Sequence, residues 1–400
     1  RRYHNHTPLT TPPAPPPPTA AAMATAAATP PHGGLPEEIV IWEILVRLPP
    51  KSLLRCRAVC RAWRSATSAR DFLAAHHDHQ PNLPIAFQEY HGGQSLLAFD
   101  NRGAAAAQLQ PVARLDDDSS LEASCDGLLL LTDYGRGVPR FCVCNPATRQ
   151  FACLPTLSGF VPLALGMYRH GPTGEYRVLV CPRDEDPATD ACYIFALGSV
   201  HPLKNIGWLP EVDEMCSSAV LSRGSLHWHL QQYESAAKVI MAFDTTAESF
   251  RRMRGPVVPS SDGLFAGMFE MDGILGVACS NDKDKIIGIW MMQDYESEVW
   301  TLKYRFELPF EEIKMQCDMR QVRVKHGDML IVVVPDGNCE LLVLSRFGNG
   351  LFQINMDGKL VGSFYREDLC LTQLQLKQTL VPHTFFPALE GYVVNAPPFI

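Results

Sequence analysis

The spacing of hydrophobic residues divides this chain into two regions. Between residues 35 and 68, apolar side chains recur every three or four positions, the period of an amphipathic helix. Beyond a hinge-like region at 76–84, short apolar runs alternate with Gly, Asn and Asp turns, a pattern typical of strands. The chain is therefore predicted to be α+β, with a small unit of three helices followed by a large all-β domain.

The first predicted helix begins at Pro36, because proline is tolerated at the first helical position, and Glu37 and Glu38 complement the helix dipole there. Pro49-Pro50 ends it. Its apolar positions recur at three-residue steps, with Ile44 beside them: Ile39, Trp42, Leu45 and Leu48.

A second short helix is predicted from Ser52, carrying Leu53, Leu54 and Val59, and a third over 61–68 with Trp63 facing back. A unit of about forty residues is too small to bury all of these apolar side chains within itself. The surplus apolar surface must pack either on the rest of this chain or on a second protein.

The β region repeats with a period near fifty residues. Turns followed by apolar runs begin at five glycines, spaced 47, 50, 49 and 54 residues apart: Gly127, Gly174, Gly224, Gly273 and Gly327. Hairpin-like turns at Asn145, Ala196, Asp244 and Asp294 are spaced 51, 48 and 50 residues apart. Two markers with one period predict a propeller-like array of blades, and the number of blades stays open.

Charge is unevenly distributed along the chain. The net charge is −8, yet residues 35–75 hold seven basic and four acidic side chains, and residues 76–400 carry a net −13. An acidic body argues against nucleic-acid binding, because that rests on neutralising phosphates. The basic helical unit suits an acidic protein partner.

Residues 1–34 are rich in Pro, Ala and Thr and are predicted to be disordered, since they offer too little apolar surface to form a core. No apolar run is long enough to span a membrane, so no membrane association is expected. Because the chain begins with Arg and Met23 lies only 12 residues before Leu35, we expect Met23 to be the biological start.

The sequence offers no convincing catalytic or metal-binding constellation. Its 13 cysteines include no C-x-x-C pair and are interpreted as reduced, buried thiols. No fixed set of Cys or carboxylate ligands accompanies the histidines at 76, 77 and 79. His227 and His229, like the aromatic residues at 290, 295, 300 and 304, are interpreted as strand packing. We therefore expect no catalytic residue, metal or cofactor.

Two acidic triplets lie in turn-rich segments and are predicted to be exposed loop tips. They are Asp116, Asp117 and Asp118, and Asp184, Glu185 and Asp186. Clustered carboxylates on loops are suited to a basic partner, so the sharper interpretation is that they bind a basic segment of a target protein.

The helical unit closely resembles the F-box of plant F-box proteins. The matching residues are Leu35-Pro36, Glu43-Ile44-Leu45, Arg47-Leu48-Pro49, Lys51-Ser52-Leu53-Leu54-Arg55, Val59-Cys60 and Arg61-Ala62-Trp63. The resemblance implies binding to a Skp-type adaptor and, through it, to cullin and RING subunits. Expected adaptor contacts are Leu35, Pro36, Ile39, Ile44, Leu45, Leu48, Pro49, Leu53, Leu54, Val59 and Trp63. Trp42 departs from the pattern because it is bulkier than the residue expected there.

Residues 120–310, and more weakly those to about 365, resemble the F-box-associated β-propeller-like domain of the same proteins. The matching residues are Cys125-Asp126-Gly127-Leu128-Leu129, Asn145-Pro146, Leu226-His227-Trp228, Ala242-Phe243-Asp244 with Glu248 and Phe250, and Ile289-Trp290 with Trp300. The segment Ala164–Tyr168 and the chain after Val381 depart from the family pattern.

The expected organisation is a disordered tail (1–34), an F-box (35–75), a hinge with the first strands (76–119), a substrate-recruiting β domain (120–380) and a C-terminal extension (381–400). The resemblance implies a non-catalytic substrate-recognition subunit of an SCF ubiquitin ligase, in the cytoplasm or nucleus. Two alternatives stay open: a non-proteolytic F-box scaffold, and a propeller-type small-molecule sensor or enzyme fused to an F-box.

Overall fold

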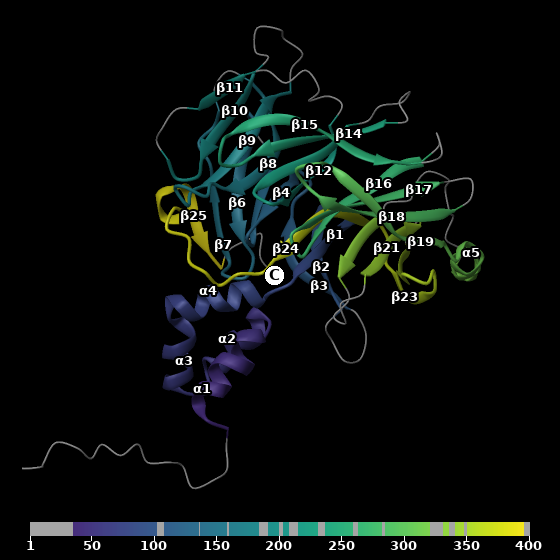
Figure 1. The fold of residues 1–400 in the computed structure, drawn as a ribbon. Coiled ribbons are helices and arrows are strands. Elements are labelled where there is room, and N and C mark those ends of the chain that lie inside the picture. Colours follow the sequence, from purple (N-terminus) through teal and green to yellow (C-terminus); the bar gives the residue numbers. More distant parts are fainter. Residues whose placement is uncertain are drawn as a thin grey trace, which may run out of the picture.

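A helical unit lies against one side of a propeller in the computed structural model (Figure 1). The structure describes residues 35–101, 108–135, 137–157, 160–183, 191–199, 203–207, 215–230, 237–258, 263–281, 285–320, 331–335, 341–347 and 350–395. Within these ranges no helix is both long and apolar enough to cross a membrane.

The helical unit contains more helix than the sequence pattern predicts. One irregular helix runs through α1 (Glu37–Ile39), a π-helical segment (Val40–Ile44) and a 3-10 turn (Leu45–Arg47), and α2 (Pro50–Cys56) and α3 (Arg61–Ser68) follow. The third predicted helix is confirmed at both ends. A fourth helix, α4 (Arg70–His79), occupies the start of the expected hinge, because Phe72, Leu73 and His76 form a buried face along it.

Six antiparallel sheets make up the described part of the propeller, which settles the open blade number. From the centre outwards, blade 1 is β24 (Leu369–Lys377), β1 (Asn82–Tyr90), β2 (Gly93–Asp100) and β3 (Gln108–Leu115). Blade 2 is β4 (Ser119–Cys125), β5 (Leu128–Asp133), β6 (Arg140–Asn145) and β7 (Gln150–Cys153), extended by β25 (Glu390–Val394). Blade 3 is β8 (Pro162–Arg169), β9 (Tyr176–Pro182), β10 (Cys192–Ala196) and β11 (Lys204–Gly207).

Blades 4 to 6 repeat the same order. Blade 4 is β12 (Met215–Ser222), β13 (Ser225–Leu230), β14 (Ala237–Asp244) and β15 (Ser249–Val257). Blade 5 is β16 (Gly263–Met271), β17 (Ile274–Asn281), β18 (Ile286–Asp294) and β19 (Val299–Glu307). After α5 (Phe310–Met319), blade 6 is β20 (Ile331–Pro335), β21 (Leu341–Phe347), β22 (Gly350–Asn355) and β23 (Leu360–Tyr365).

The ring closes by pairing the two ends of the β region. Strand β24 is antiparallel to β1, with Leu83 opposite Leu376 and Phe87 opposite Cys370. The inner strands β24, β4, β8, β12, β16 and β20 contact one another in turn around the centre. The propeller therefore begins at residue 82 and its ring closes with β24 at residue 377, and the expected start at 120 is wrong, because β1–β3 form a blade with the last inner strand.

The fifty-residue period has a structural cause. Gly127, Gly174, Gly224 and Gly273 all lie in the connection between the first and second strands of a blade. At Asp126-Gly127 both φ angles are positive (48° and 84°), as in the two-residue turns that match the twist of a hairpin. The hairpin-like turns that begin at Asn145, Ala196, Asp244 and Asp294 connect the third strand of a blade to the fourth. Gly327, the last glycine of the first series, lies outside the described residues.

The C-terminal segment is part of the domain and not an extension beyond it. After β24, residues 378–389 carry Leu380, Phe386 and Leu389 into buried positions, and β25 then pairs with β7 at the outer edge of blade 2. We call residues 378–394 the C-terminal strap. The expected boundary at 380 is wrong, because the strap continues the cores of both the helical unit and blade 2.

Candidate functional site

The helical unit exposes a set of large apolar side chains. Six of them are at least two-fifths exposed: Leu35 (61%), Ile39 (42%), Trp42 (43%), Ile44 (42%), Leu54 (42%) and Val59 (65%). Pro36, at the start of the first helix, is exposed as well. We call these seven residues the apolar face. It includes six of the predicted adaptor contacts and adds Trp42, which the sequence marked only as a departure from the family pattern.

The other predicted contacts hold the unit together. Leu45 (2% exposed) and Leu53 (0%) are buried with Phe72, so they cannot touch a partner in this structure. Leu48 and Trp63 are half-buried against the same core, and Pro49 is half-buried. Leu45 lies in the 3-10 turn that ends the irregular first helix, and Leu53 lies on the buried side of α2, so the hydrophobic period alone did not distinguish these positions from the exposed ones.

Side-chain hydrogen bonds brace the short helices beneath the apolar face. The Cys60 sulfur accepts from the Trp63 backbone N–H (3.4 Å) at the start of α3. Arg57 donates to the Thr67 hydroxyl (3.1 Å) and carbonyl (2.6 Å) across α3, and burial, with Arg64 nearby, lowers the pKa of Arg57. The Trp42 ring packs on Phe72 with centroids 5.6 Å apart. These contacts fix the short helices that carry the apolar face.

The helical unit is joined to the propeller through the C-terminal strap. Leu380 (7% exposed) is a member of the helical core, and Val381 packs against it. From α4, His77 Nε2 lies 3.9 Å from Asp126 Oδ1, at the turn that follows β4. The helical unit therefore sits at the propeller face where the inner strands end.

A cavity of about 810 Å³ lies at this junction. It is lined by α4, by the turn between β8 and β9, and by the strap, including Arg70, His77, Asp126, Tyr176 and His383. His383 Nε2 and His77 Nδ1 are buried and have no hydrogen-bond partner among the described residues. Burial lowers the pKa of His383 to about 4, although Asp126 acts in the opposite direction, so this imidazole is neutral at pH 7.

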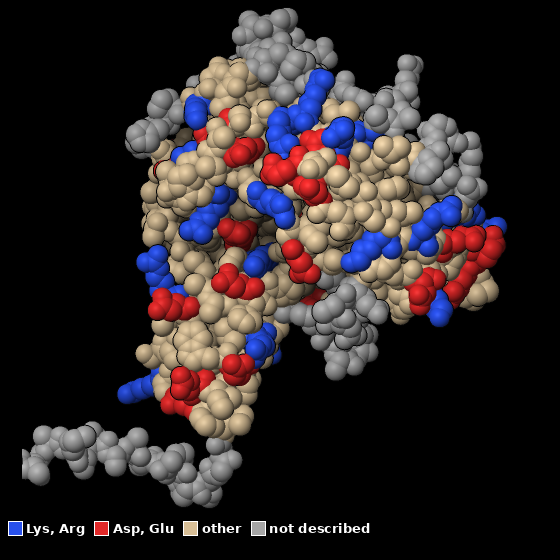
Figure 2. All heavy atoms as spheres, in the orientation of Figure 1, with Lys and Arg blue, Asp and Glu red and all other residues tan. Residues whose placement is uncertain are grey.

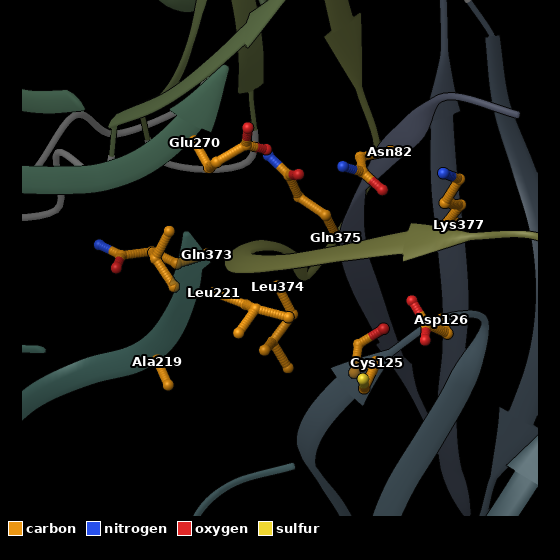
Figure 3. Close-up of a pocket in the computed structure, with 12 residues that line it drawn as sticks. Asn82, Cys125, Asp126, Ala219, Leu221, Glu270, Gln373, Leu374, Gln375 and Lys377 are labelled. Carbon is orange, nitrogen blue, oxygen red and sulfur yellow. The ribbon is translucent and has the colours of Figure 1, made fainter. Parts of the chain in front are cut away.

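A smaller cavity, of about 240 Å³, opens where the inner strands end near the propeller axis (Figure 3). Gln375 and Glu270 point toward one another across it. Lys377 and Asp126 contribute opposite charges, and Leu374 and Leu221 form an apolar part of its wall. Its volume is enough for a single side chain or a few waters.

The structure describes only one of the two acidic triplets. Asp116–Asp118 are exposed in the turn between β3 and β4, as predicted, whereas Asp184, Glu185 and Asp186 lie outside the described residues. Asp116–Asp118 precede β4 and Asp126 follows it, so this seven-residue strand separates the two positions by about 20 Å. The first triplet therefore lies on the propeller face away from the helical unit. Figure 2 shows both signs of charge interspersed over the face in view, with no continuous acidic surface.

The blade histidines and aromatic residues pack in the sheets. His227 lies 2.8 Å from the Tyr295 hydroxyl and 3.2 Å from the Val220 carbonyl, and burial lowers its pKa to about 4. His229 is 8% exposed, and burial likewise lowers its pKa to about 4. No group of three or more metal-binding side chains occurs among the described residues.

A buried carboxylate links blades 3 and 4. Glu248 accepts hydrogen bonds from Tyr168 (2.8 Å), Arg177 (2.5 Å) and Lys204 (2.5 Å). Burial alone would raise the pKa of Glu248, but these three donors outweigh it and lower the pKa to about 2. The three donors lie on strands of blade 3 and the carboxylate lies in blade 4, so the cluster connects the two blades.

Comparisons with known proteins match both parts of the chain. The family model described as F-box-like matches residues 33–78, and the one described as F-box associated beta propeller domain matches residues 112–344. The F-box protein At5g49610 of Arabidopsis thaliana is 26% identical over 290 residues, covering 67% of this chain and 77% of the relative.

Two further relatives from Arabidopsis thaliana extend over similar shares. The F-box/LRR-repeat protein At2g43260 is 25% identical over 311 residues (72% of this chain, 70% of the relative). The F-box protein CPR1 is 26% identical over 321 residues (69% of this chain, 73% of the relative).

Proposed function

Because this chain belongs to the F-box proteins that carry an F-box-associated β-propeller domain, we propose that it is a substrate-recognition subunit of an SCF ubiquitin ligase. In this role the F-box binds a Skp-type adaptor, which connects to cullin and RING subunits, while the propeller binds a target protein. The chain contributes no catalytic group of its own. It accelerates ubiquitin transfer by raising the effective concentration of the target near the conjugating enzyme.

The observation that carries this proposal is the apolar face on a unit whose core is already filled. Leu45, Leu53 and Phe72 are buried inside the unit, whereas the side chains of the apolar face stay exposed and are available to a partner. Fully burying one such side chain is worth about 1.5–3 kcal/mol. Several together offset an association cost of about 4–15 kcal/mol, which makes specific binding feasible for so small a unit.

Target binding is proposed for the face away from the F-box. The turn Asp116–Asp118 lies there, exposed, at the far end of β4 from the F-box junction. A target held at this face would not compete with the adaptor for space. The carboxylates favour a basic target segment.

The adaptor role can be tested on the full chain with a double substitution, Leu35→Ala with Ile39→Ala. Both side chains are exposed, so folding should be unaffected while co-purification with a Skp adaptor falls sharply. Val361→Ala is the matched control, because Val361 is similarly exposed (52%) but lies on β23 in the propeller. Full retention of adaptor by the double variant would contradict the assignment of the apolar face.

The target role needs a separate measurement, since a scaffold would bind partners without destroying them. A target of a degradation receptor should accumulate on this chain when the proteasome is blocked, and should gain ubiquitin in an adaptor-dependent manner. Bound partners whose abundance ignores proteasome inhibition would favour the non-proteolytic scaffold instead.

The junction cavity favours a sensor as the second candidate. Its volume of about 810 Å³ falls within the range of small-molecule sites, and two of its imidazoles have unpartnered buried nitrogens. Native mass spectrometry of the purified full chain should reveal a bound small molecule if this alternative holds. A single mass equal to that of the polypeptide would count against it.

The proposed role places the protein in the cytoplasm or nucleus, where the ubiquitin machinery acts and thiols stay reduced. The cysteines whose side chains the structure describes form no disulfide, in keeping with a reducing compartment. Imaging of a tagged full chain tests this placement.

A further inference from the structure

Two cysteines face each other directly in blade 2. Cys142 on β6 and Cys153 on β7 are cross-strand partners, and their sulfur atoms are 2.7 Å apart. Both are buried, at 1% and 5% exposed, on the side of the blade that packs with Leu129 and Leu131. The two thiols are therefore held in contact by the sheet itself.

The pair is close to the geometry of a disulfide. A disulfide has sulfurs about 2.05 Å apart, so the two sulfurs need to approach by only about 0.7 Å. Directly opposed residues in an antiparallel sheet have Cβ atoms about 4.5–5.5 Å apart, near the upper limit of what a disulfide spans. Side-chain rotation with slight strand movement is enough to connect them.

The two thiols are chemically unequal. The hydrogen bond from Cys142 lowers the pKa of Cys153, an effect that burial opposes and nearby Arg140 reinforces. The same hydrogen bond, followed by burial, raises the pKa of Cys142. Asp133 and Glu390 also face Cys153 and act against its ionisation. Cys153 is therefore the thiol that more readily forms the nucleophilic thiolate, and Cys142 is the thiol that resolves it.

A third cysteine provides the internal comparison. Cys144 lies two residues further along β6, on the same side of the strand, and is equally buried. Its cross-strand partner is Phe151, so no sulfur lies opposite, and burial raises its pKa to about 12. Cys142 and Cys144 lie on the same strand and are equally buried, but the pairing register of β6 with β7 places a cysteine opposite Cys142 only.

We propose that Cys142 and Cys153 form an oxidation site that a hydroperoxide converts to a disulfide. The Cys153 thiolate attacks the peroxide oxygen, which breaks the O–O bond and gives a sulfenic acid. With hydrogen peroxide, the other oxygen leaves as hydroxide, which takes up the proton that the Cys153 thiol released and becomes water. The Cys142 sulfur then attacks the Cys153 sulfur, forming the S–S bond and expelling a second water. Two thiols are oxidised by two electrons and one peroxide is reduced.

The bond would reinforce the strand that holds the C-terminal strap. Cys153 is opposite Cys142 on one side of β7 and opposite Glu390 of β25 on the other. Oxidation would thus connect β6 covalently to the strand on which β25 is docked, and the strap leads back to Leu380 in the F-box core. The inference concerns the chain's response to oxidants and does not rest on the proposed ligase role.

The test is thiol mapping of the folded full chain. The reduced protein is exposed to hydrogen peroxide under native conditions, free thiols are alkylated, and the protein is digested with trypsin. Cleavage after Arg149 separates the two cysteines, so a disulfide appears as one linked species lighter by two hydrogen atoms than the two reduced peptides. Loss of two alkylatable thiols and a rise in the thermal unfolding midpoint are expected together.

Two variants show which cysteines form the disulfide. Cys144→Ala should keep the linked species, and Cys153→Ser should lose both the link and the oxidant-dependent rise in unfolding midpoint. Cys142 and Cys153 both found alkylated after peroxide treatment of the folded wild-type chain would overturn the proposal, as would a link that involves Cys144. Because the mapping is done on the wild-type chain, a variant that fails to fold does not leave the question undecided.

Discussion

At the scale of single residues, the two F-box tryptophans have opposite roles. Trp63 is half-buried against the core that contains Leu53 and Phe72. Trp42 is 43% exposed, although its ring packs on Phe72 with centroids 5.6 Å apart. Both residues are equally hydrophobic, so burial alone assigns Trp63 to folding and Trp42 to the apolar face.

Trp63→Ala should destabilise the F-box by about 3 kcal/mol, the low end for loss of a large core side chain, because Trp63 is only half-buried. The helices should then become sensitive to limited proteolysis. Trp42→Ala is the matched control and should keep the cleavage pattern while weakening adaptor binding. Equal protease resistance of wild type and Trp63→Ala would show that Trp63 is not part of the core.

His383 should make the junction sensitive to acid. Its folded-state pKa is about 4, set by burial, against an ordinary value of 6.5. The folded state therefore binds fewer protons than the unfolded state, so the stability that this neutral imidazole supports is complete above pH 6.5 and is lost as the pH falls toward 4. The groups around it are Asp126, His77, Arg169 and Tyr176.

His383→Gln removes this titration. The urea midpoint of the variant should fall less than that of wild type across the same pH interval, and His91→Gln, at an exposed position, should behave like wild type. Parallel losses of stability in wild type and His383→Gln would exclude His383 as a source of the acid sensitivity.

At the scale of elements, the C-terminal strap joins three separate parts of the chain. Leu380 packs in the F-box core, Phe386 packs in the core shared by blades 2 and 3, and β25 pairs with β7. Such long-range contacts hold the F-box in a fixed position on the propeller. A flexible linker would not provide this fixed placement.

Leu380→Ala should destabilise the F-box by about 2–5 kcal/mol, as expected for a leucine removed from a core. The expected signature is faster amide hydrogen exchange in α2 and α4, with the propeller strands unchanged. Val394→Ala, on β25 and 46% exposed, is the control and should leave exchange in α2 and α4 as in wild type. Unchanged exchange in Leu380→Ala would mean that the F-box core is complete without the strap.

At the scale of the whole molecule, the proposed adaptor and target surfaces lie at opposite faces of the propeller. The F-box sits where the inner strands end, near Asp126, and the turn Asp116–Asp118 lies where β4 begins. The two surfaces also differ in chemistry, since one is apolar and the other is charged. A rise in salt concentration should therefore weaken target binding more than adaptor binding.

Target capture should weaken as salt rises, because the screening length falls to about 10 Å at 0.1 M, whereas adaptor binding should change little. Changing Asp116, Asp117 and Asp118 together to Asn should reduce target capture and leave the adaptor bound. A pull-down at low and physiological salt measures both. Target capture that is insensitive to salt and to the triple change would indicate an apolar recognition surface.

The fifty-residue repeat and three of the helices could be predicted from local features of the sequence. Turn chemistry such as Asp126-Gly127 is local, since two positive φ angles favour Gly, Asn or Asp wherever the turn occurs. For this reason the fifty-residue period, the helix at 61–68 and the resemblance to F-box proteins could all be read without a structure. Leu35, Ile39, Ile44, Leu54 and Val59 were expected to contact the adaptor, and the structure leaves all five exposed, while the contact itself stays a prediction.

The contacts between segments far apart in the chain could not be predicted from the sequence. Burial of Leu45 and Leu53, closure of blade 1 by β24, and the packing of Leu380 in the F-box depend on contacts between residues far apart in sequence. No local period records such contacts, because a strand or an apolar residue has the same pattern whichever partner it finds. The register that sets Cys142 against Cys153, and Cys144 against Phe151, is the clearest case, since a shift in strand pairing would have exchanged their roles.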